Sequence, residues 1–324
     1  MEWFSAWAEA FGPGLLAPNA GQALPLVWRS CGAGGVPIRC LRGPANEHTP
    51  WLQLPDGLER ALPSWPQELL RAYDADMLLL PLLRRDSQNL SVLPPGPLTR
   101  WQPGGRAPFV DCSGSWEQYW SGRGRKTRSE WARAERRLQE QGYRLGCHRG
   151  EEGLEEVLGE AFAIEADSWK GDEGSAILQD PDLERFYRRV ARDWAARSLL
   201  RLYFLEGPEG RVAFQLCARD SDRLASLKIG FRRDLARWGP GQALQLMILR
   251  ELFADPDVSR FDLLGPATRH KLKWGTGMDQ LWTVRCYRPG LRGGVAAMRW
   301  SVLPAVRSWA SRVRAPSSEG ELGS

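Results

Sequence analysis

The stretch that most constrains this 324-residue chain is residues 223–275, where a strand, a glycine-containing turn, a helix and a second strand follow one another. The apolar segment 224–231 predicts the first strand, and residues 259–264 predict the second. Between them, Trp238-Gly-Pro-Gly-Gln-Ala-Leu predicts a helix start. Pro240 falls at or next to the first helical position, where its missing N–H costs nothing.

The predicted helix start is suited to binding a phosphate. We expect the backbone N–H groups of Gly241, Gln242 and Ala243 to point out of the helix end, because the first turn of a helix leaves its amides without intrahelical partners. The positive end of the helix dipole lies behind these amides. The sequence therefore predicts a phosphate or pyrophosphate site here.

Five separated pieces of the chain occur in an order that resembles one enzyme superfamily. They are Glu165…Ser168-Trp169-Lys170, Phe186-Tyr187, Leu227-Lys-Ile-Gly-Phe231, Gly239-Pro-Gly-Gln-Ala-Leu244, and Phe261-Asp-Leu-Leu-Gly265 followed by His270-Lys271 and Trp274-Gly275. These motifs resemble the GNAT acyltransferases, and best match the CelD-like branch related to the FemAB aminoacyltransferases. In the usual pyrophosphate signature, Gln/Arg-x-x-Gly-x-Gly/Ala, Gly241 and Ala243 fit, but Trp238 takes the first place and Arg237 lies one residue away.

The resemblance implies an α/β (α+β) GNAT fold, with a mixed sheet in which two neighbouring parallel strands splay apart. Residues 224–231 and 259–264 would be those strands. Acyl-CoA would then be the co-substrate, with no metal. Its pantetheine arm would pair with the backbone of Ile229 and Gly230, and its phosphates would bind at Arg237, Gly239, Gly241, Gln242 and Ala243.

We expect three parts along the chain. Residues 1–110 would be a degenerate GNAT-like N-terminal domain, 111–290 the GNAT acyltransferase domain, and 291–324 a basic amphipathic tail with a disordered end. The tandem arrangement is implied by the FemAB resemblance, since no internal repeat is visible. Within the first part, the proline-rich residues 93–109 indicate a linker or crossing segment.

Two segments concentrate positive charge. Residues 121–150 hold nine Arg or Lys against three Glu, and Trp131, Ala134 and Leu138 predict an amphipathic helix there. Its basic face is either simply solvated or a collar for CoA phosphates, a nucleotide sugar, a lipid surface or tRNA. The tail helix either packs back on the fold or rests on a membrane or partner. Its apolar stripe is Val295, Met298, Val302, Val306, Trp309 and Val313.

Three residues near the second strand are candidate catalytic groups. Lys271 is the first candidate: it matches the lysine of the aromatic-Lys motif in FemAB-like enzymes, so the resemblance implies that it stabilises developing negative charge. The alternative is a surface lysine that binds phosphate or solvent. His270 has an intrinsic pKa suited to a general base, although a lone loop histidine is commonplace. Asp262 lies mid-strand and needs a partner, which we expect to be the substrate amine, Lys271 or Arg269.

Other residues are candidates for the acceptor side. Glu165 and Trp169 match a Glu…Trp segment of the family that points to the acceptor cleft. Lys228, among apolar strand residues, would face the acceptor or a phosphate. Asn46 and His48 resemble a substrate-contacting segment of the relatives, or form an ordinary Asx turn. Tyr287 is a further candidate general acid.

The whole chain is typical of a globular enzyme, with 43% hydrophobic and 26% charged residues. We expect a cytoplasmic protein, because no apolar run reaches the ~20 residues of a membrane span and no signal peptide is recognisable. The scattered cysteines and missing H-E-x-x-H, G-x-S-x-G and Walker A sequences argue against zinc, serine-hydrolase and P-loop chemistry.

The sequence thus predicts an N-acyltransferase that moves an acyl group from acyl-CoA to an amino sugar, an amino lipid base or a biosynthetic amine. Two alternatives stay open. One is FemAB-like aminoacyl transfer from tRNA to a peptidoglycan precursor, and the other is a catalytically silent module that binds an anionic ligand.

Overall fold

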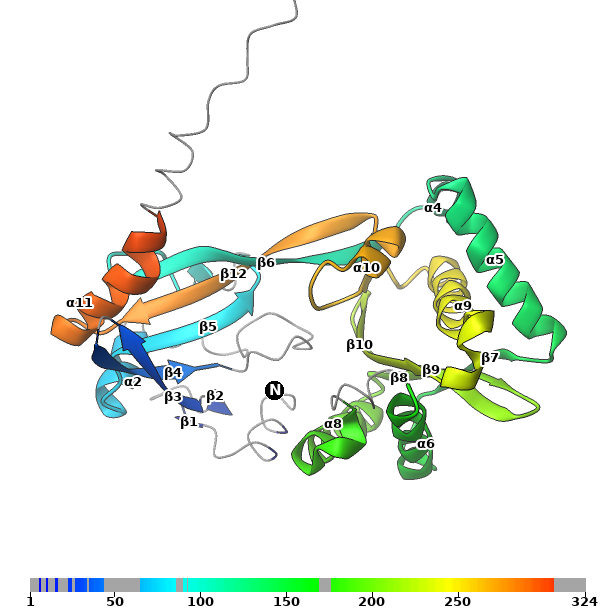
Figure 1. Ribbon diagram of the computed structural model, residues 1–324, viewed down its shortest axis with the longest axis horizontal. Helices are drawn as coiled ribbons and strands as arrows, with labels where there is room; N and C mark the ends of the chain where they lie inside the picture. Colours follow the sequence, from blue (N-terminus) through cyan, green and yellow to red (C-terminus); the bar gives the residue numbers. More distant parts are fainter. Residues whose placement is uncertain are drawn as a thin grey trace, which may run out of the picture. The chain divides into compact units, whose positions relative to one another are not determined.

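A computed structural model describes residues 15–16, 23–24, 27–33, 35–43, 65–85, 90–91, 93–168 and 176–305, together with Ala6 and Ala10 (Figure 1). The chain divides into two compact units. The first consists of residues 1–14, 46–52 and 105–281, and the second of residues 15–45, 53–104 and 282–324. The strands β6 (Thr99–Asp111) and β12 (Gly277–Tyr287) belong partly to each unit.

The first unit is a mixed sheet with helices on both faces. Hydrogen-bonded neighbours follow the order β6-β11-β10-β9-β8-β7, in which β10 and β11 are parallel and the other pairs are antiparallel. The strands are β7 (Arg144–His148), β8 (Leu200–Gly207), β9 (Gly210–Asp220), β10 (Arg223–Phe231) and β11 (Arg260–Asp262). The strands predicted at residues 224–231 and 259–264 are therefore confirmed as β10 and β11, and β11 is shorter than predicted.

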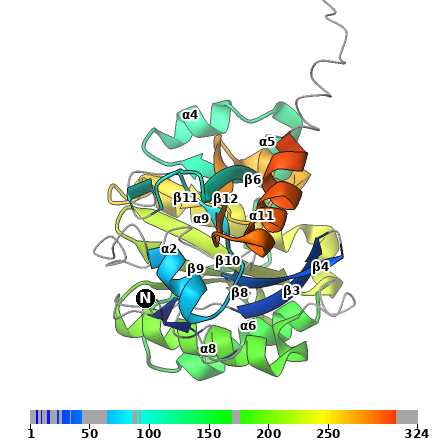
Figure 2. The ribbon, with the colours of Figure 1, turned by 90° about the vertical axis from the view of Figure 1, so that its left-hand side faces the viewer.

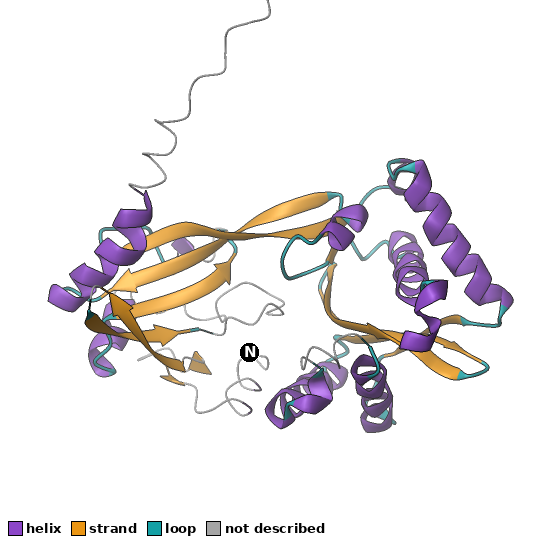
Figure 3. Ribbon diagram, viewed as in Figure 1, coloured by secondary structure: helices purple, strands orange, loops and turns teal. Residues whose placement is uncertain are grey.

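Helices cover this sheet in two layers (Figures 1 and 3). On one face lie α6 (Leu154–Ala166) and α8 (Pro181–Ala196), with the short 3-10 turn η2 (Ile177–Gln179) between them in the chain. On the other face lies α9 (Pro240–Ala254), preceded by the 3-10 helix η3 (Arg233–Trp238). The predicted basic helix is α5 (Arg125–Glu140); it packs against α9 and follows α4 (Trp116–Ser121). Figure 2 shows the same layering from the side.

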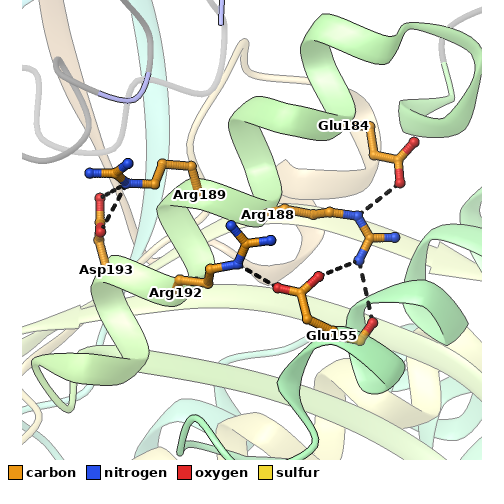
Figure 4. A network of polar contacts seen from close by, with 6 residues as sticks. All are labelled: Glu155, Glu184, Arg188, Arg189, Arg192 and Asp193. Carbon is orange, nitrogen blue, oxygen red and sulfur yellow. Dashed lines mark hydrogen bonds and ion pairs between the residues drawn. The ribbon is translucent and has the colours of Figure 1, made fainter. Parts of the chain in front are cut away.

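Local signals explain why α8 forms and how it is fixed. Asp180 caps its start by accepting from the N–H groups of Asp182 (3.0 Å) and Leu183 (3.2 Å), and Pro181 occupies the first turn. Glu155 of α6 then pairs with two arginines of α8 (Figure 4), at 2.9 Å from Arg188 and 2.5 Å from Arg192. These pairs join the two helices that carry one side of the site described below.

The second unit contains the other strands of the same ten-stranded order and has its own hydrophobic core. Its order is β3-β4-β5-β12-β6, with β3 (Val27–Ala33), β4 (Val36–Arg42) and β5 (Met77–Leu83). The β4–β5 pair is parallel, while β3–β4 and β5–β12 are antiparallel. Helix α2 (Trp65–Ala72) buries Leu69 and Leu70 in this core, and β1 (Leu15–Leu16) pairs with β2 (Ala23–Leu24). Together the two orders contain ten strands among the described residues.

Of the two predictions for residues 93–109, the linker was wrong for most of the segment, because β6 runs from Thr99 to Asp111. The crossing segment fits, because β6 begins in the second unit and ends in the first. Its prolines suggested a break, but a proline in a strand gives up only its N–H. Pro108 still accepts a hydrogen bond from the N–H of Leu263 (3.1 Å). The pairing that stabilises β6 comes from strands more than a hundred residues later, which local sequence does not reveal.

The tail forms α11 (Leu291–Ala297) and the π-helical turn η4 (Met298–Val302), and of its predicted apolar stripe Val295 packs against the core of the second unit, whereas Met298 and Val302 do not belong to the buried face. Met298 and Val302 are 51% and 43% exposed, whereas Gly293 and Ala296 are buried. A Cβ on Gly293 would lie 1.8 Å from the carbonyl oxygen of Arg288, so close packing selects the small residues. Val306, Trp309 and Val313 lie outside the described residues. No helix in the described ranges is long and apolar enough to cross a membrane.

Candidate functional site

The two parallel strands β10 and β11 diverge after three residue pairs, as the predicted splay requires. Arg223 pairs with Arg260, Leu224 with Phe261, and Ala225 with Asp262. β11 pairs with β6 over the same three residues and ends at Asp262, whereas β10 continues along β9 to Phe231 with a register shift between Ser226 and Lys228. The far half of β10 is thereby separated from its parallel neighbour.

The helix α9 begins beside the far end of β10. Gly239 is the N-cap, with φ of 72°, a left-handed conformation that favours glycine, and Pro240 follows at the first helical position. The N–H of Ala243 donates to the carbonyl of Gly239 (3.0 Å), which makes it the first intrahelical bond. The prediction of a free Ala243 amide was therefore wrong, while Gly241 and Gln242 precede that bond, where helical amides lack intrahelical partners.

A cavity of 280 Å³ adjoins this helix start. It lies between α5 and the η3–α9 junction, and its charged lining is three arginines, Arg133, Arg137 and Arg237, against Glu130. Arg237 is exposed, with its guanidinium 5.9 Å from the ring centroid of Trp238, and Arg137 donates to the Arg237 carbonyl (3.4 Å). The cavity therefore combines positive side chains with a helix N-terminus, an arrangement that favours anions.

A buried ion pair lies on the α6–α8 side of β10. Glu165 is 0% exposed and Lys228 is 6% exposed; Nζ of Lys228 is 3.7 Å from Oε1 of Glu165. Oε2 of Glu165 accepts from the N–H of Ile177 (2.9 Å). Lys228 also lies over the Tyr187 ring, 5.1 Å from its centroid. The sequence predicted Glu165 and Lys228 separately, and the structure brings them together.

Tyr187 completes this group; from the sequence it was named only within the Phe186-Tyr187 piece of the resemblance and was given no role. Its hydroxyl is buried and has no hydrogen-bond partner within the described part of the chain. Desolvation, and then the charge of Glu165, raises the pKa of Tyr187 well above its usual value, so the phenol is neutral. Gly230 permits the close approach of α6, because a Cβ there would lie 2.6 Å from the Phe214 ring and 3.1 Å from the Cα of Glu165.

Lys271 lies on the β11 side of the divergence between β10 and β11, in the short helix α10 (Arg269–Trp274). Its Nζ donates to the carbonyl of Leu264 (2.5 Å). Leu264 and Gly265 have φ of 44° and 61°, so two successive left-handed residues turn the chain at the end of β11. A non-glycine residue in this conformation is strained, and such strain gathers at functional sites.

Asp262 and His270 both precede Lys271 in the sequence, but their surroundings differ. Asp262 is buried and accepts from Arg260 (2.7 Å), a partner that the sequence prediction had not included. His270 is exposed, with its ring edge-on to Trp274 at 6.4 Å between centroids. Partial desolvation, followed by the charges of Lys273 and Lys271, lowers the pKa of His270 below its ordinary 6.5, so the imidazole is neutral at pH 7.

The remaining candidates fall elsewhere. Trp169, Asn46 and His48 lie outside the described residues. Tyr287 belongs to the core of the second unit, where its hydroxyl hydrogen-bonds Ser301 (2.6 Å), which gives no support to a role as general acid. In the described ranges, no three His, Cys, Asp or Glu side chains are grouped so that they could hold a metal ion. Ile229, at 43% exposure, lies on β10 beyond its last pair with β11.

Comparison with known proteins finds one matching domain model and several solved structures with a similar fold. The model of the acetyltransferase (GNAT) domain matches residues 125–272, whereas no curated protein sequence matches the chain. FemX is a similar solved structure, with a TM-score of 0.55, 10% identity, and coverage of 92% of this chain and 93% of that one.

Two further structures share the fold. One is the C-terminal domain described as that of a lysylphosphatidylglycerol synthetase from Agrobacterium fabrum, with a TM-score of 0.53, 11% identity, and coverage of 93% and 92%. The other is a conserved protein of unknown function from Bacteroides thetaiotaomicron, with a TM-score of 0.54, 10% identity, and coverage of 89% and 90%. The chain thus carries a GNAT domain at residues 125–272 and has the fold of the GNAT acyltransferases and their FemAB relatives.

Proposed function

We propose that this protein transfers an acyl group from acyl-CoA to an amine. The observation that carries the proposal is the divergence of β10 and β11 beside the start of α9. An extended donor with amide groups can add to the unpaired edge of β10, as a peptide adds to a sheet edge. Its phosphates would meet the amides of Gly241 and Gln242 and the arginines of the adjoining cavity.

In the proposed reaction the amine nitrogen attacks the thioester carbonyl carbon. A C–N bond forms, the C–S bond breaks, and the proton lost by the amine ends on the CoA thiolate. The ammonium of Lys271, near the end of β11, is the group proposed to stabilise the oxyanion of the tetrahedral intermediate. His270, neutral because of its lowered pKa, is the candidate base for the amine proton. Asp262 holds Arg260 in place at the same strand.

The acceptor would lie against Glu165 and Lys228. A buried carboxylate beside a buried ammonium offers complementary charge to an acceptor that carries both an amine and a negatively charged or hydroxyl group. Amino sugars, amino lipid bases and biosynthetic amines all fit this description. Acceptor binding at this pair is part of the proposal.

The donor can be tested by thermal unfolding with acetyl-CoA, palmitoyl-CoA, CoA and charged tRNA. A ligand that binds the native state raises the unfolding temperature by mass action. We expect protection by an acyl-CoA, and weaker protection in Arg133→Ala and Arg237→Ala, which remove lining arginines. Arg136→Ala is the matched control, because Arg136 is an exposed arginine of the same helix that does not line the cavity.

A second candidate, aminoacyl transfer from tRNA, is favoured by the surface of α5. Arg125, Lys126, Arg133, Arg136 and Arg137 are all exposed on this one helix. Binding of a nucleic acid by such a surface would weaken steeply with salt, because it releases counterions. Protection by charged tRNA alone, abolished by salt and reduced by Arg136→Ala as much as by Arg133→Ala, would replace the acyl-CoA proposal. Protection without any turnover would favour the silent binding module.

A further inference from the structure

The helix that carries Lys271 cannot hold its place unaided. α10 has six residues, far fewer than an isolated helix needs to persist in water. At its start, the Thr268 hydroxyl accepts from the N–H of Lys271 (3.4 Å), a long and therefore weak cap. The position of Lys271 consequently depends on what holds the other end of α10.

That other end is held by side chains from α4 and the α4–α5 connection. Arg123 donates to the carbonyls of Lys273 (3.3 Å), Trp274 (3.4 Å) and Gly275 (2.9 Å). The hydroxyl of Tyr119 donates to the Trp274 carbonyl (3.0 Å), and the Arg123 guanidinium lies 4.8 Å from the centroid of the Tyr119 ring. The last carbonyls of a helix lack intrahelical donors, so these bonds satisfy groups that would otherwise need water.

An aromatic stack secures the same end. Trp131 of α5 and Trp274 of α10 lie face to face, with ring centroids 3.4 Å apart and planes 3° from parallel, and both are buried. Trp120 adjoins Trp131 (6.4 Å), and Tyr119 packs on Phe253 of α9 (5.0 Å). Helices α4, α5, α9 and α10 therefore share one aromatic cluster in the first unit.

The stack also borders the cavity at the start of α9. Trp131 is one of the residues that line this cavity, together with Gly239 and Gln242. One tryptophan thus forms part of the wall of the donor cavity and supports the helix of Lys271.

We propose that Arg123, Tyr119, Trp131 and Trp274, here called the α10 clamp, are positioning residues for Lys271. The clamp holds α10 so that the Lys271 ammonium stays at the Leu264 carbonyl, at the open end of β11. The role in catalysis rests on the proposed acyltransferase function, because it assumes that Lys271 acts on the reacting carbonyl. The contacts of the α10 clamp do not depend on that function.

Hydrogen exchange without any ligand tests the clamp alone. In Arg123→Ala we expect about tenfold faster exchange at the amides of residues 271–276, the change expected when bonds from a charged donor are lost. Arg125→Ala is the matched control, because Arg125 is an exposed arginine two residues away. Equal exchange in the two variants would overturn the clamp, whatever the protein's activity.

Steady-state kinetics with the acyl-CoA that protects the protein then tests positioning. We expect Arg123→Ala to lower kcat with the donor KM unchanged, and Arg123→Lys to restore part of the loss, since a lysine reaches the carbonyls with a single ammonium. Should Arg123→Ala fail to fold, Arg123→Lys and Tyr119→Phe carry the same two measurements, because Tyr119 does not line the donor cavity. Faster exchange with unchanged kcat would overturn the positioning role, and faster exchange with no turnover in any variant would overturn the proposed function but leave the clamp.

Discussion

The two sides of the gap between β10 and β11 are built differently. On the α6–α8 side, Glu165, Lys228 and Tyr187 are buried and lie against one another. On the β11–α10 side, Lys271 is half-buried and His270 is exposed, and α10 depends on contacts at its ends. The α6–α8 side is buried in the interior, whereas the α10 side is a short helix whose residues are mostly exposed or half-buried.

This difference separates the effects of mutation on the two sides. Charges taken out of water depend on their partners, so a change on the buried side should act first on stability. A half-exposed ammonium can be removed with little loss of packing, so a change on the α10 side should act first on turnover. The contrast fails if a change on the buried side lowers turnover without lowering stability, or if a change on the α10 side lowers stability without lowering turnover.

The largest effect is expected from Lys228→Met, which leaves Glu165 as a buried charge without its ion-pair partner. We expect the free energy of unfolding to fall by about 3–5 kcal/mol, the usual cost of breaking a buried pair from one end. The measurement is the midpoint of denaturant unfolding. Adding Glu165→Gln should recover much of the loss, because a glutamine oxygen can still accept from Ile177 without carrying charge. A Lys228→Met protein as stable as the wild type would show that the pair is not coupled.

The next effect is expected from Lys271→Ala. Turnover should fall by about 10²-fold or more with donor affinity little changed, the behaviour of a group that acts in the transition state. The unfolding midpoint should move far less than in Lys228→Met, because Lys271 is half-buried, whereas Lys228 is only 6% exposed. Steady-state kinetics and denaturant unfolding of the same sample show whether Lys271 acts on turnover or on stability. A large loss of stability with unchanged turnover would show that Lys271 stabilises the turn at Leu264 and is not a catalytic group.

Elements of the first unit with local signals could be predicted from the sequence. The start of α9 is set by Gly239 and Pro240, and that of α8 by Asp180 and Pro181, so short-range chemistry places both. The β6 strand was missed because its partners β11 and β12 lie far along the chain. The buried face of the tail was missed because the approach of Gly293 to Arg288, not hydrophobicity, selects it.

The sequence named residues of the candidate site one by one but gave no sign of how they assemble. The motifs pointed to Glu165, Lys228 and Lys271, each from its own stretch of sequence. Sequence spacing carried no sign that Lys228 pairs with Glu165, that Tyr187 lies beside them, or that the basic segment 121–150 reaches α10. Such contacts depend on how distant elements pack. The division into tandem GNAT-like domains stays a prediction, since the two observed units draw on different ranges of the chain.

The smallest expected effect concerns the pH dependence of the α10 side. Desolvation, and then the charges of Lys273 and Lys271, holds the pKa of His270 below 6.5, so a base at this position stays active in mildly acidic solution. Lys273→Met removes one repelling charge and should raise this pKa, so the acidic limb of the kcat/KM profile moves toward higher pH.

Two controls isolate the histidine. Lys273→Arg keeps the positive charge and should leave the acidic limb where it is, and the alkaline plateau should be the same in all three proteins. Because the folded pKa of His270 lies below the unfolded value, the unfolded state binds more protons between the two values, so stability falls as the pH drops through that window. An acidic limb that does not move in Lys273→Met, or that persists in His270→Gln, would assign the titration to another group. The exposed side of the gap would then contribute a cation but no base, and proton removal would fall to the buried side at Glu165.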